Sequence, residues 1–491
     1  MSWGLYGLGL LANLLLVALV ALVVVSAVLF IIDRRQPHDA VRRNYPVIGR
    51  FRGLFIHLGE FFRQYFFAMD REEMPFNRAE RDWVSHSASG GDNTVAFGST
   101  RSLTKVGTPI FVNAPFPPIH GEYVEEPPIL IGPHAREPYE APSFFNISAM
   151  SFGALSRPAV QALSRGAKRA GCWLNTGEGG LAPYHLEGGC DVVMQIGTAK
   201  YGVRDEDGNL SDTKLREVAA HEQVKMFELK LAQGAKPGKG GILPAEKVTD
   251  EIAAIRGITA GQPSISPNRH TDVASVAELL DVISHIREVT GKPVGFKTVI
   301  GSFEWLDDLC AEIHKRGSEH APDFITVDSG DGGTGAAPMP LMDNVGLTIK
   351  EALPQVADIL ARHGLKKRIR LIASGKLITP AEVAWALCAG ADIVTSARGF
   401  MFAIGCIQAM KCNKNTCPTG VTTHDEHLNR GLVPDDKAPK VEHFVGKIRY
   451  GVGLIAHSCG VKRPRALERH HVRIVQDTGK SAPLSEIYPG G

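Results

Sequence analysis

Residues 324–335 read FITVDSGDGGTG, an apolar run that passes directly into a loop of small and polar residues. The first four residues are aromatic or β-branched, and such residues favour a β-strand. Glycine fills four of the last six positions, so the loop lacks bulk and its backbone can lie against a planar ring or a phosphate group. An ordinary flexible turn is the alternative. The stretch predicts a strand with a candidate ligand-binding loop at its carboxyl end.

The same pattern of a short apolar run, a small or polar end and a helical stretch recurs along the chain. Eight strands that alternate with helices predict an α/β protein with a (β/α)8 TIM barrel. The expected strands are residues 144–150, 173–176, 192–196, 227–232, 294–299, 324–327, 370–373 and 393–396. The clearest helical periodicity falls at residues 275–289, 306–314, 349–363 and 380–389.

Glycine-rich and polar residues gather just beyond the ends of these strands. They stand at residues 151–153, 177–180, 234–241, 297, 329–335, 374–376 and 397–399. The carboxyl ends of barrel strands share one face, and active sites of barrels lie there. The sequence therefore predicts a single site at the mouth of the barrel.

The loops after the seventh and eighth strands are candidates for a phosphate cup. One carries Ser374, Gly375 and Lys376, and the other carries Ala397, Arg398 and Gly399. Backbone N–H groups in such loops, helped by helix dipoles, bind phosphate at this position in many barrels. Two ordinary glycine turns are the alternative.

Two groups of polar residues predict an anionic ligand. Lys297 ends an apolar strand and points into the barrel mouth, where a buried lysine needs an anion or a reduced flavin nearby. Gln233, Lys236 and Lys239 place fixed donors in one turned loop, which suits a dicarboxylate. A structural lysine and a solvated loop are the alternatives.

Three cysteines, Cys406, Cys412 and Cys417, lie in one short loop that ends in Cys-Pro. Thiolates gathered in this way can hold iron, and an odd set of three fits a three-iron cluster. Zinc would need a fourth ligand, for which His424 and His427 are nearest. Buried cysteines without a metal are the other alternative.

The N-terminal residues 4–32 carry no charged side chain. This run exceeds the roughly 20 apolar residues that a membrane-spanning helix needs. A cleaved signal peptide is the alternative, but no basic residue precedes the run. Arginines gather just after it, so the positive-inside rule places the rest of the chain in the cytoplasm. Residues 51–69, rich in aromatic residues, fit either a helix on the membrane surface or a core helix.

Composition narrows the function further. The chain has 54 basic and 52 acidic residues among 491, which argues against a nucleic-acid partner. Eight cysteines in this length do not form a disulfide framework, so a reducing compartment is expected. The expected domains are a transmembrane helix at 4–32, an extension at 33–142 that packs on the barrel, the barrel at 143–432 with its cysteine loop at 406–417, and a C-terminal extension at 433–491.

Six motifs in one order resemble those of a known family. They are ISAMSFGALS at 147–156, NTGEGG at 175–180, AQGAKPGKGG at 232–241, ISP at 265–267, GGTGA at 332–336 and the cysteine loop. The chain resembles the FMN-binding domain of glutamate synthase, and more closely the short, single-domain glutamate synthase-related proteins. The resemblance covers residues 143–425.

This resemblance implies two cofactors, FMN and a [3Fe-4S] cluster, and a residue set for each. FMN would lie at the barrel mouth on Met150, Ser151, Gln195, Lys297, Gly332, Gly333, Thr334, Gly335, Ser374, Gly375, Lys376, Ala397, Arg398 and Gly399. A 2-oxoglutarate pocket would use Glu178, Lys230, Gln233 and Lys236, and the cluster would use Cys406, Cys412 and Cys417. Lys297, Glu178 and Lys236 would be catalytic. Electrons would pass from a donor to the cluster, to FMN and to 2-iminoglutarate, giving L-glutamate.

The chain departs from the family pattern at several points. A membrane helix stands where glutamine-using relatives carry a glutaminase domain, so ammonia is expected to come from outside. Lys200 replaces the usual arginine and Lys239 a glutamate, which leaves the identity of the acid open. The electron donor would be an NADPH-oxidising subunit, a ferredoxin or a membrane carrier. The alternatives are a membrane-linked FMN amino-acid dehydrogenase or N-alkylglutamate synthase, and a non-catalytic barrel scaffold.

Overall fold

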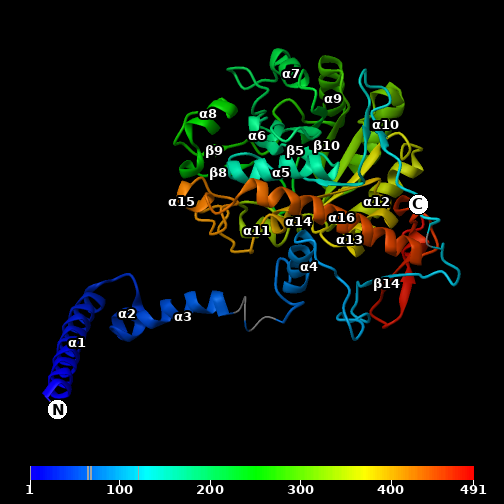
Figure 1. Cartoon of the computed structure of the whole chain (residues 1–491). Coiled ribbons are helices and arrows are strands. Elements are labelled where there is room, and N and C mark those ends of the chain that lie inside the picture. Colours follow the sequence, from blue (N-terminus) through cyan, green and yellow to red (C-terminus); the bar gives the residue numbers. More distant parts are fainter. Residues whose placement is uncertain (1, 63–65, 67–68, 120, 491) are drawn as a thin grey trace. The chain divides into compact units, whose positions relative to one another are not determined.

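The computed structural model describes residues 2–62, 66, 69–119 and 121–490 (Figure 1). Contacts divide the chain into two compact units, Met1–Ala79 and Glu80–Gly491. Residues 80–142, expected to pack on the barrel, therefore belong to the same unit as the barrel strands.

Eight parallel strands in the second unit close into a barrel, as the sequence predicted (Figure 1). Neighbours in the barrel follow chain order, and the last strand pairs with the first. The strands are β4 (Phe145–Ile147), β5 (Leu174–Asn175), β6 (Val192–Ile196), β7 (Val224–Lys230), β10 (Val294–Val299), β11 (Phe324–Asp328), β12 (Arg370–Ser374) and β13 (Ile393–Ser396). Most positions are buried, because helices cover the outer face and side chains fill the interior.

Each strand appears where the sequence placed one. The largest difference at a strand start is at β7, which begins at Val224, three residues before the expected start. Lys225 interrupts the apolar run there, and its amine lies 4.0 Å from Asp191. The charged Lys225 interrupts the apolar pattern, and for this reason the sequence did not predict the first three residues of β7.

Helices between the strands form the outer layer of the barrel. The four helices expected from periodicity appear within two residues of their expected bounds as α9, α10, α12 and α13. The layer comprises α5 (Arg157–Ala170), α6 (Pro183–Leu186), α7 (Asp212–Ala219), α9 (Val276–Thr290), α10 (Glu304–Arg316), α12 (Ile349–Arg362), α13 (Pro380–Cys388) and α14 (Arg398–Ala403).

The long helix α16 (Pro434–Ser458) packs along α5 and also contacts α13 and α14 (Figure 1). Gly166 of α5 makes the close approach possible, since a Cβ there would lie 2.4 Å from Cβ of Val441. An aromatic cluster joins the same helices to the barrel: Phe400 stacks on Phe145 at 5.5 Å, and Phe444 meets Phe400 edge-on at 5.2 Å.

The extensions on either side of the barrel pair with each other. β1 (Pro109–Phe111) pairs with β14 (Val472–Val475), which pairs with β15 (Ser481–Pro483). The hairpin of β2 (Ile129–Ile131) and β3 (Tyr139–Ala141) lies at the amino ends of the barrel strands. There the hydroxyl of Tyr139 donates to Asp191 at 2.8 Å, just before β6, and Nε of Arg370 donates to the carbonyl of Leu130 at 3.0 Å.

The remaining short elements of the described part are α4, α8, α11, α15, α17, β8 and β9. They span Arg78–Ala88, Asp250–Arg256, Met339–Met342, Glu426–Asn429, Leu484–Ile487, Ile242–Leu243 and Ser264–Ile265, respectively. β8, α8 and β9 form an insertion between β7 and α9.

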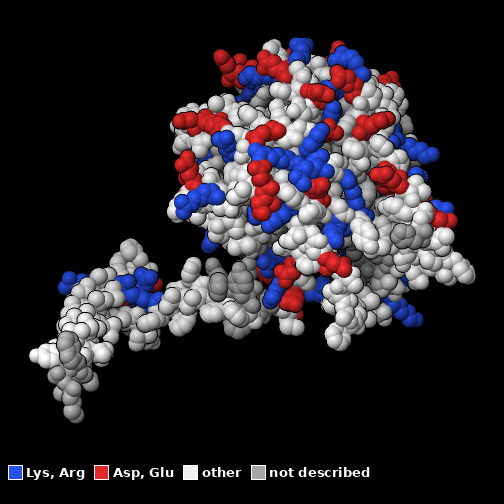
Figure 2. Space-filling view, viewed as in Figure 1, with Lys and Arg blue, Asp and Glu red and all other residues white. Residues whose placement is uncertain are grey.

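The first unit is built from α1 (Ser2–Arg35), α2 (Ala40–Asn44) and α3 (Ile48–Phe62). Within the described residues, α1 is the one helix long and apolar enough to cross a membrane, over Gly9–Arg35. Helix α1 carries no charged side chain before its last turn, which holds Asp33, Arg34 and Arg35. Figure 2 shows acidic and basic residues interspersed on the visible face of the second unit. The expected aromatic segment 51–69 begins inside α3, and its residues 63–65 and 67–68 lie outside the described residues.

Candidate active site at the barrel mouth

A cavity opens at the carboxyl ends of the barrel strands, where the sequence predicted the site. Its lining residues enclose about 1290 Å³ of space free of atoms, a volume that includes open solvent. Each of the eight strands, or the loop after it, contributes a lining residue. The insertion after β7 and the cysteine loop complete the wall.

Most of the residues expected at the site meet in this cavity. Its lining includes Met150, Ser151, Glu178, Gln195, Lys230, Gln233, Lys236, Lys297, Gly333, Thr334, Gly335, Ser374, Gly375, Lys376, Ala397, Arg398 and Cys412. Gly332, Gly399, Cys406 and Cys417 are not among the lining residues. Gly399 serves packing instead, because a Cβ there would lie 2.9 Å from the ring of Phe444. Gly332 turns tightly, with its Cβ position 2.9 Å from the carbonyl oxygen of Ser329.

A buried polar network lies inside the barrel beneath the cavity. Glu228 of β7 accepts hydrogen bonds from the amides of Asn175 at 2.8 Å and Gln195 at 2.7 Å, and from the hydroxyl of Thr326 at 2.6 Å. Nε2 of Gln195 donates to Glu228, which lies below the cavity. The carbonyl oxygen of Gln195 is therefore left to accept a hydrogen bond from a ligand in the cavity. Sequence reasoning missed Glu228, although an acid within an apolar barrel strand is itself a signal of a buried network.

Two lysines of the cavity are paired with carboxylates. Nζ of Lys230 lies 2.9 Å from Glu178, and Nζ of Lys297 lies 3.3 Å from Asp328. Burial raises the pKa of Glu178, but Lys230 outweighs this effect and the net shift is downward. Burial lowers the pKa of Lys297, but Asp328 and then Glu228 outweigh it and the net shift is upward. Glu178 and Lys297 are therefore charged near neutral pH.

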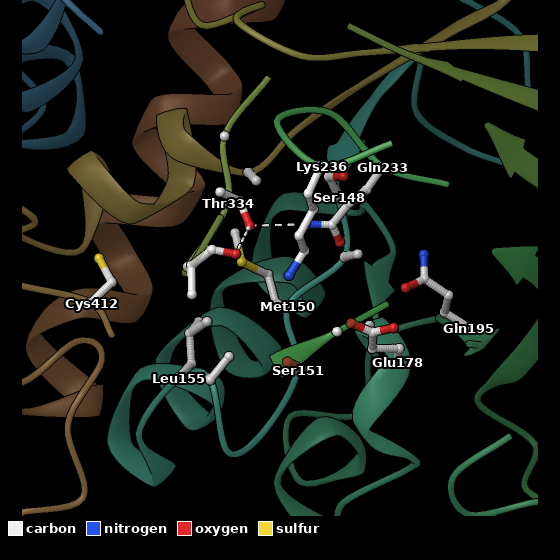
Figure 3. Close-up of a pocket in the computed structure, with 18 of the residues that line it drawn as sticks. Ser148, Met150, Ser151, Leu155, Glu178, Gln195, Gln233, Lys236, Thr334 and Cys412 are labelled. Atoms are coloured by element: carbon white, nitrogen blue, oxygen red, sulfur yellow. Dashed lines mark hydrogen bonds between the residues drawn. The ribbon is translucent and has the colours of Figure 1, made fainter. Parts of the chain in front are cut away.

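Lys236 differs from these lysines because it has no carboxylate partner. Its side chain is 4% exposed, and within the described chain its amine makes no hydrogen bond or ion pair. Figure 3 shows it entering the cavity beside Gln233, whose amide donates to Thr334 at 3.0 Å. Burial, and then the charge of Lys230, lower the pKa of Lys236 to about 8. A buried ammonium of this kind is a ready partner for an anion.

Arg256, from α8 in the insertion, adds a second cation that pattern reading missed. It is buried, donates only to the hydroxyl of Ser264 at 3.2 Å and the carbonyl of Phe152 at 3.3 Å, and its Nε lacks a partner among the described residues. Burial lowers its pKa. The charge excess of the cavity wall is therefore positive on the side that holds Lys236.

The loops after β12 and β13 face the cavity with free backbone donors. The N–H groups of Gly375 and Lys376 donate to no group in the described part of the chain. Gly375 has φ 105°, and a Cβ there would lie 2.5 Å from Cβ of Ser329, so only glycine fits the turn. Lys376 also adopts a positive φ and pairs with Asp331 at 3.0 Å. These features suit a bound phosphate group.

Arg398 connects the cavity with the cysteine loop. One guanidinium nitrogen donates to the carbonyl of Thr334, and another lies 3.9 Å from the sulfur of Cys412 and 3.4 Å from that of Met401. On the opposite side Lys247, buried and unnoticed in the sequence, donates to the carbonyls of Ala154 at 2.7 Å and Cys412 at 3.3 Å. Two cations thus flank the loop.

The three cysteines of the loop are free thiols at different depths. Cys417 is buried, whereas Cys406 and Cys412 are half-buried. Burial, followed by smaller contributions from the other two thiols, raises the pKa of Cys406, although Arg398 opposes the shift. Burial raises the pKa of Cys417, but hydrogen bonds from Thr419 and Thr422 outweigh it and lower the value overall. The thiols of Cys412 and Cys417 therefore lie close enough to Cys406 to influence its pKa.

The zinc alternative finds no support in this arrangement. Among the residues that the structure describes, no three His, Cys, Asp or Glu side chains gather closely enough to hold a single metal ion. His424 is engaged elsewhere, because its Nε2 lies 2.8 Å from the carbonyl of Gly153.

Residues 110–462 match the family model described as the conserved region in glutamate synthase. The glutamate synthase large subunit-like protein YerD of Bacillus subtilis is 39% identical over 504 residues, which cover 95% of each chain. The archaeal-type glutamate synthase [NADPH] of Thermotoga maritima is 32% identical over 65% of this chain and 60% of its own length. A mandelate oxidase mutant with the monooxide FMN adduct matches with a TM-score of 0.45 and 15% identity, over 74% of this chain and 88% of that one.

The match confirms the family expected from the motifs. It extends beyond the barrel on both sides, since the family model begins at residue 110 and ends within the C-terminal extension. The chain spans about three fifths of the archaeal-type relatives that it matches and nearly all of YerD. By its sequence, the chain belongs to the glutamate synthase family of oxidoreductases.

Proposed function

We propose that the protein is an FMN-dependent oxidoreductase that reductively aminates 2-oxoglutarate, through 2-iminoglutarate, to L-glutamate, with ammonia supplied from outside the chain. The observation that carries the proposal is the buried ammonium of Lys236, which enters the cavity without a carboxylate partner. A substrate acid would supply the missing negative charge. Family membership and the names of the relatives support the same reaction.

The cavity offers a place for each part of FMN. The free N–H groups of Gly375 and Lys376, with Ala397 and Arg398 nearby, would hold the phosphate. The open backbone at Gly335, where a Cβ would touch nothing within 4 Å, would lie against the ring system, together with Met150, Ser151, Gln195, Lys297, Gly333 and Thr334. When bound, FMN would supply the hydride that reduces a carbon–nitrogen double bond.

The protein's own groups would bind and orient the acid. The ammonium of Lys236 and the guanidinium of Arg256 would hold its carboxylates, and Gln233 would add an amide donor. Glu178 holds Lys230 in place through their ion pair. Lys297, held by Asp328, would present a positive charge and a proton toward the reacting nitrogen, which polarises the imine. The insertion after β7 would reduce the access of water to this part of the cavity.

Cys406, Cys412 and Cys417 would hold a [3Fe-4S] cluster, which would supply single electrons. Arg398 and Lys247 would offset its negative charge. The donor would be a separate NADPH-oxidising subunit, a ferredoxin or a membrane carrier, and the names of the archaeal-type relatives include NADPH. Helix α1 would anchor the protein in the cell membrane as a single pass, with Arg34 and Arg35 on the cytoplasmic side with the barrel.

A second candidate is a membrane-linked amino-acid dehydrogenase or N-alkylglutamate synthase. Lys200, which replaces the arginine expected from the resemblance, does not line the cavity, and its amine pairs with Asp272 at 3.0 Å. The clamp that an arginine would give the substrate is thus absent from that position, which favours a different acid or amine.

The test combines cofactor analysis with turnover. The purified full chain should be yellow-brown, release FMN on denaturation and contain iron and sulfide. With a chemical electron donor it should convert 2-oxoglutarate and ammonia to L-glutamate. Turnover with methylamine but not ammonia would favour the second candidate, and a colourless protein without flavin would overturn both in favour of a scaffold.

A further inference from the structure

Helix α3 (Ile48–Phe62) exposes an apolar face along its length. Successive residues of a helix turn by about 100°, so five of its large apolar residues fall within an arc of about 120°. These residues and their exposed fractions are Ile48 72%, Phe51 51%, Leu54 49%, Phe55 66% and Phe62 39%. This much exposed apolar surface on one face marks a binding surface.

The flanks of this face carry arginines, and its reverse side holds two glycines together with Ile56 and Glu60. Arg50 and Arg52 fall on either side of the apolar arc, and Gly49 and Gly53 fall on the opposite side. Basic residues beside an apolar face are typical of helices that lie in the plane of a membrane surface. Arg34, Arg35, Arg42 and Arg43 precede α3 and add positive charge to the same unit.

A buried ion pair ties the start of α3 to the end of α1. Asp33, in the last turn of α1, is fully buried and receives Nη2 of Arg50 at 2.7 Å, Nε of Arg50 at 2.8 Å and the N–H of Val47 at 3.0 Å. The candidate membrane span Gly9–Arg35 ends at this point, so α3 begins at the level where α1 leaves the apolar layer. In Figure 1, α3 runs across the direction of α1.

We infer that α3 is a second membrane element, which lies in the bilayer interface with its apolar face in the acyl boundary and Arg52, the arginine of α3 that is not paired with Asp33, on anionic lipid head groups. This inference rests on the proposed anchoring by α1. Charge complementarity and continuity with the end of α1 favour lipid as the occupant, whereas the second unit or another copy of the chain are competing occupants that the experiment separates.

The experiment attaches a nitroxide spin label to single introduced cysteines of the full chain in lipid nanodiscs. Phe51→Cys places the label on the apolar face, and Gly53→Cys places it two residues away on the opposite side, where an added Cβ meets nothing within 4 Å. Oxygen concentrates in lipid and a nickel chelate stays in water. Position 51 should be accessible to oxygen and protected from nickel, and position 53 should show the reverse. The unsubstituted chain gives the background of its native cysteines.

Three results would overturn the inference. Strong nickel access at both positions would place α3 in water, and weak access of both reagents at position 51 would place its apolar face against protein. Equal results in nanodiscs of phosphatidylcholine and of phosphatidylcholine with phosphatidylglycerol would remove the role of anionic lipid. A Val20→Cys label in α1 reports on the anchor separately, because nickel access there would refute the membrane span itself, whatever happens at α3.

Discussion

Lys236 and Lys297 show how one residue type takes opposite roles within a single cavity. Both are buried, but Lys297 has Asp328 at 3.3 Å and keeps its charge, whereas Lys236 has no carboxylate and its pKa falls to about 8. An anion that binds beside Lys236 would restore its pKa toward the usual value. The unpaired lysine is therefore the group whose protonation reports on substrate binding.

The pH dependence of catalysis follows from this difference. Below about pH 8 Lys236 is protonated and attracts the acid, and above that pH the neutral amine does not, so kcat/KM for 2-oxoglutarate should fall as the pH rises through 8. In Lys236→Arg, whose side chain stays charged, that alkaline limb should disappear. Steady-state rates from pH 6.5 to 9.5 provide the measurement, and persistence of the limb in Lys236→Arg would assign it to another group.

The cysteine loop makes a separate prediction at the residue scale. Cys412→Ser should lower the iron content and abolish turnover with a protein electron donor, because the serine hydroxyl does not replace a thiolate ligand. FMN content should stay unchanged. Cys310→Ala, which removes a buried thiol of α10 far from the loop in sequence, is the control and should keep its iron. Equal iron in both variants would contradict the assignment, as measured by metal analysis and visible absorption.

Sequence reasoning found the residues of the site that stand in glycine-rich loops and missed several that do not. Lys236 and Gly375 follow barrel strands directly, so their place at the mouth could be read from the pattern. Arg256 and Lys247 come from the insertion after β7, whose fold over the cavity depends on long-range packing that leaves no periodic signal. Gly399 looked like a phosphate-loop glycine, but the ring of Phe444 explains its small size.

At the scale of elements, the packing of α16 on α5 depends on one glycine. Gly166→Ala would bring a methyl group within 2.4 Å of Cβ of Val441 and 2.9 Å of the carbonyl of Ala438, so α16 must shift. We expect a loss of about 1–3 kcal/mol in unfolding free energy. The matched control is Gly446→Ala in α16, where nothing lies within 4 Å and the change should be neutral or stabilising by up to about 1 kcal/mol.

Urea unfolding in detergent, followed by near-ultraviolet circular dichroism, measures both variants. The sign of the difference between them is the test, since both substitutions add one methyl group to a helical glycine. A stable Gly166→Ala variant would show that α16 can move away from α5 without cost.

A buried histidine of helix α6 should make the stability of the fold sensitive to acid. His185 is buried, its Nδ1 accepts from the N–H of Ala182 at 3.0 Å and its Nε2 donates to the carbonyl of Met150 at 3.0 Å. Burial lowers its pKa to about 4 from 6.5. Between these values the unfolded chain binds the proton and the folded chain does not, so stability falls as the pH drops from 6.5 toward 4.

The expected loss from His185 is about 2 kcal/mol on going from pH 7 to pH 5. His185→Gln, which can keep an acceptor and a donor but does not titrate, should lose less stability over the same interval. The unfolding midpoints of the two proteins at both pH values give the comparison. His270, whose pKa burial also lowers to about 4, is common to both proteins and leaves their difference unaffected.

On the scale of the whole molecule, the barrel was predictable because strands buried on both faces read as near-continuous apolar runs. Even β5, only Leu174 and Asn175 long, lay inside an expected strand. The pairing of β1 with β14 was not predictable, because nothing in the sequence of either short strand indicates which distant strand it pairs with. Helix α1 was evident from composition alone, since residues 4–32 carry no charge.

The proposed anchor predicts how the full chain behaves in membranes. After expression, the protein should remain in the membrane pellet through washes with high salt and with alkaline carbonate, and detergent should release it, because the predominantly apolar span Gly9–Arg35 of 27 residues is long enough to cross the bilayer. Immunoblots of pellet and supernatant provide the measurement. Release by carbonate would show that α1 does not span the membrane.

The sheet that joins β1 to β14 has a consequence for biosynthesis. Strand β1, residues 109–111, cannot pair until β14 is synthesised, more than 350 residues later in the chain. Helix α1 precedes the barrel strands in the chain, so under the proposed anchoring it would enter the membrane while those strands are still unmade. The nascent polypeptide would then be tethered for most of its synthesis with an unfinished barrel, a state in which chaperones must shield it from aggregation until the last strands leave the exit tunnel.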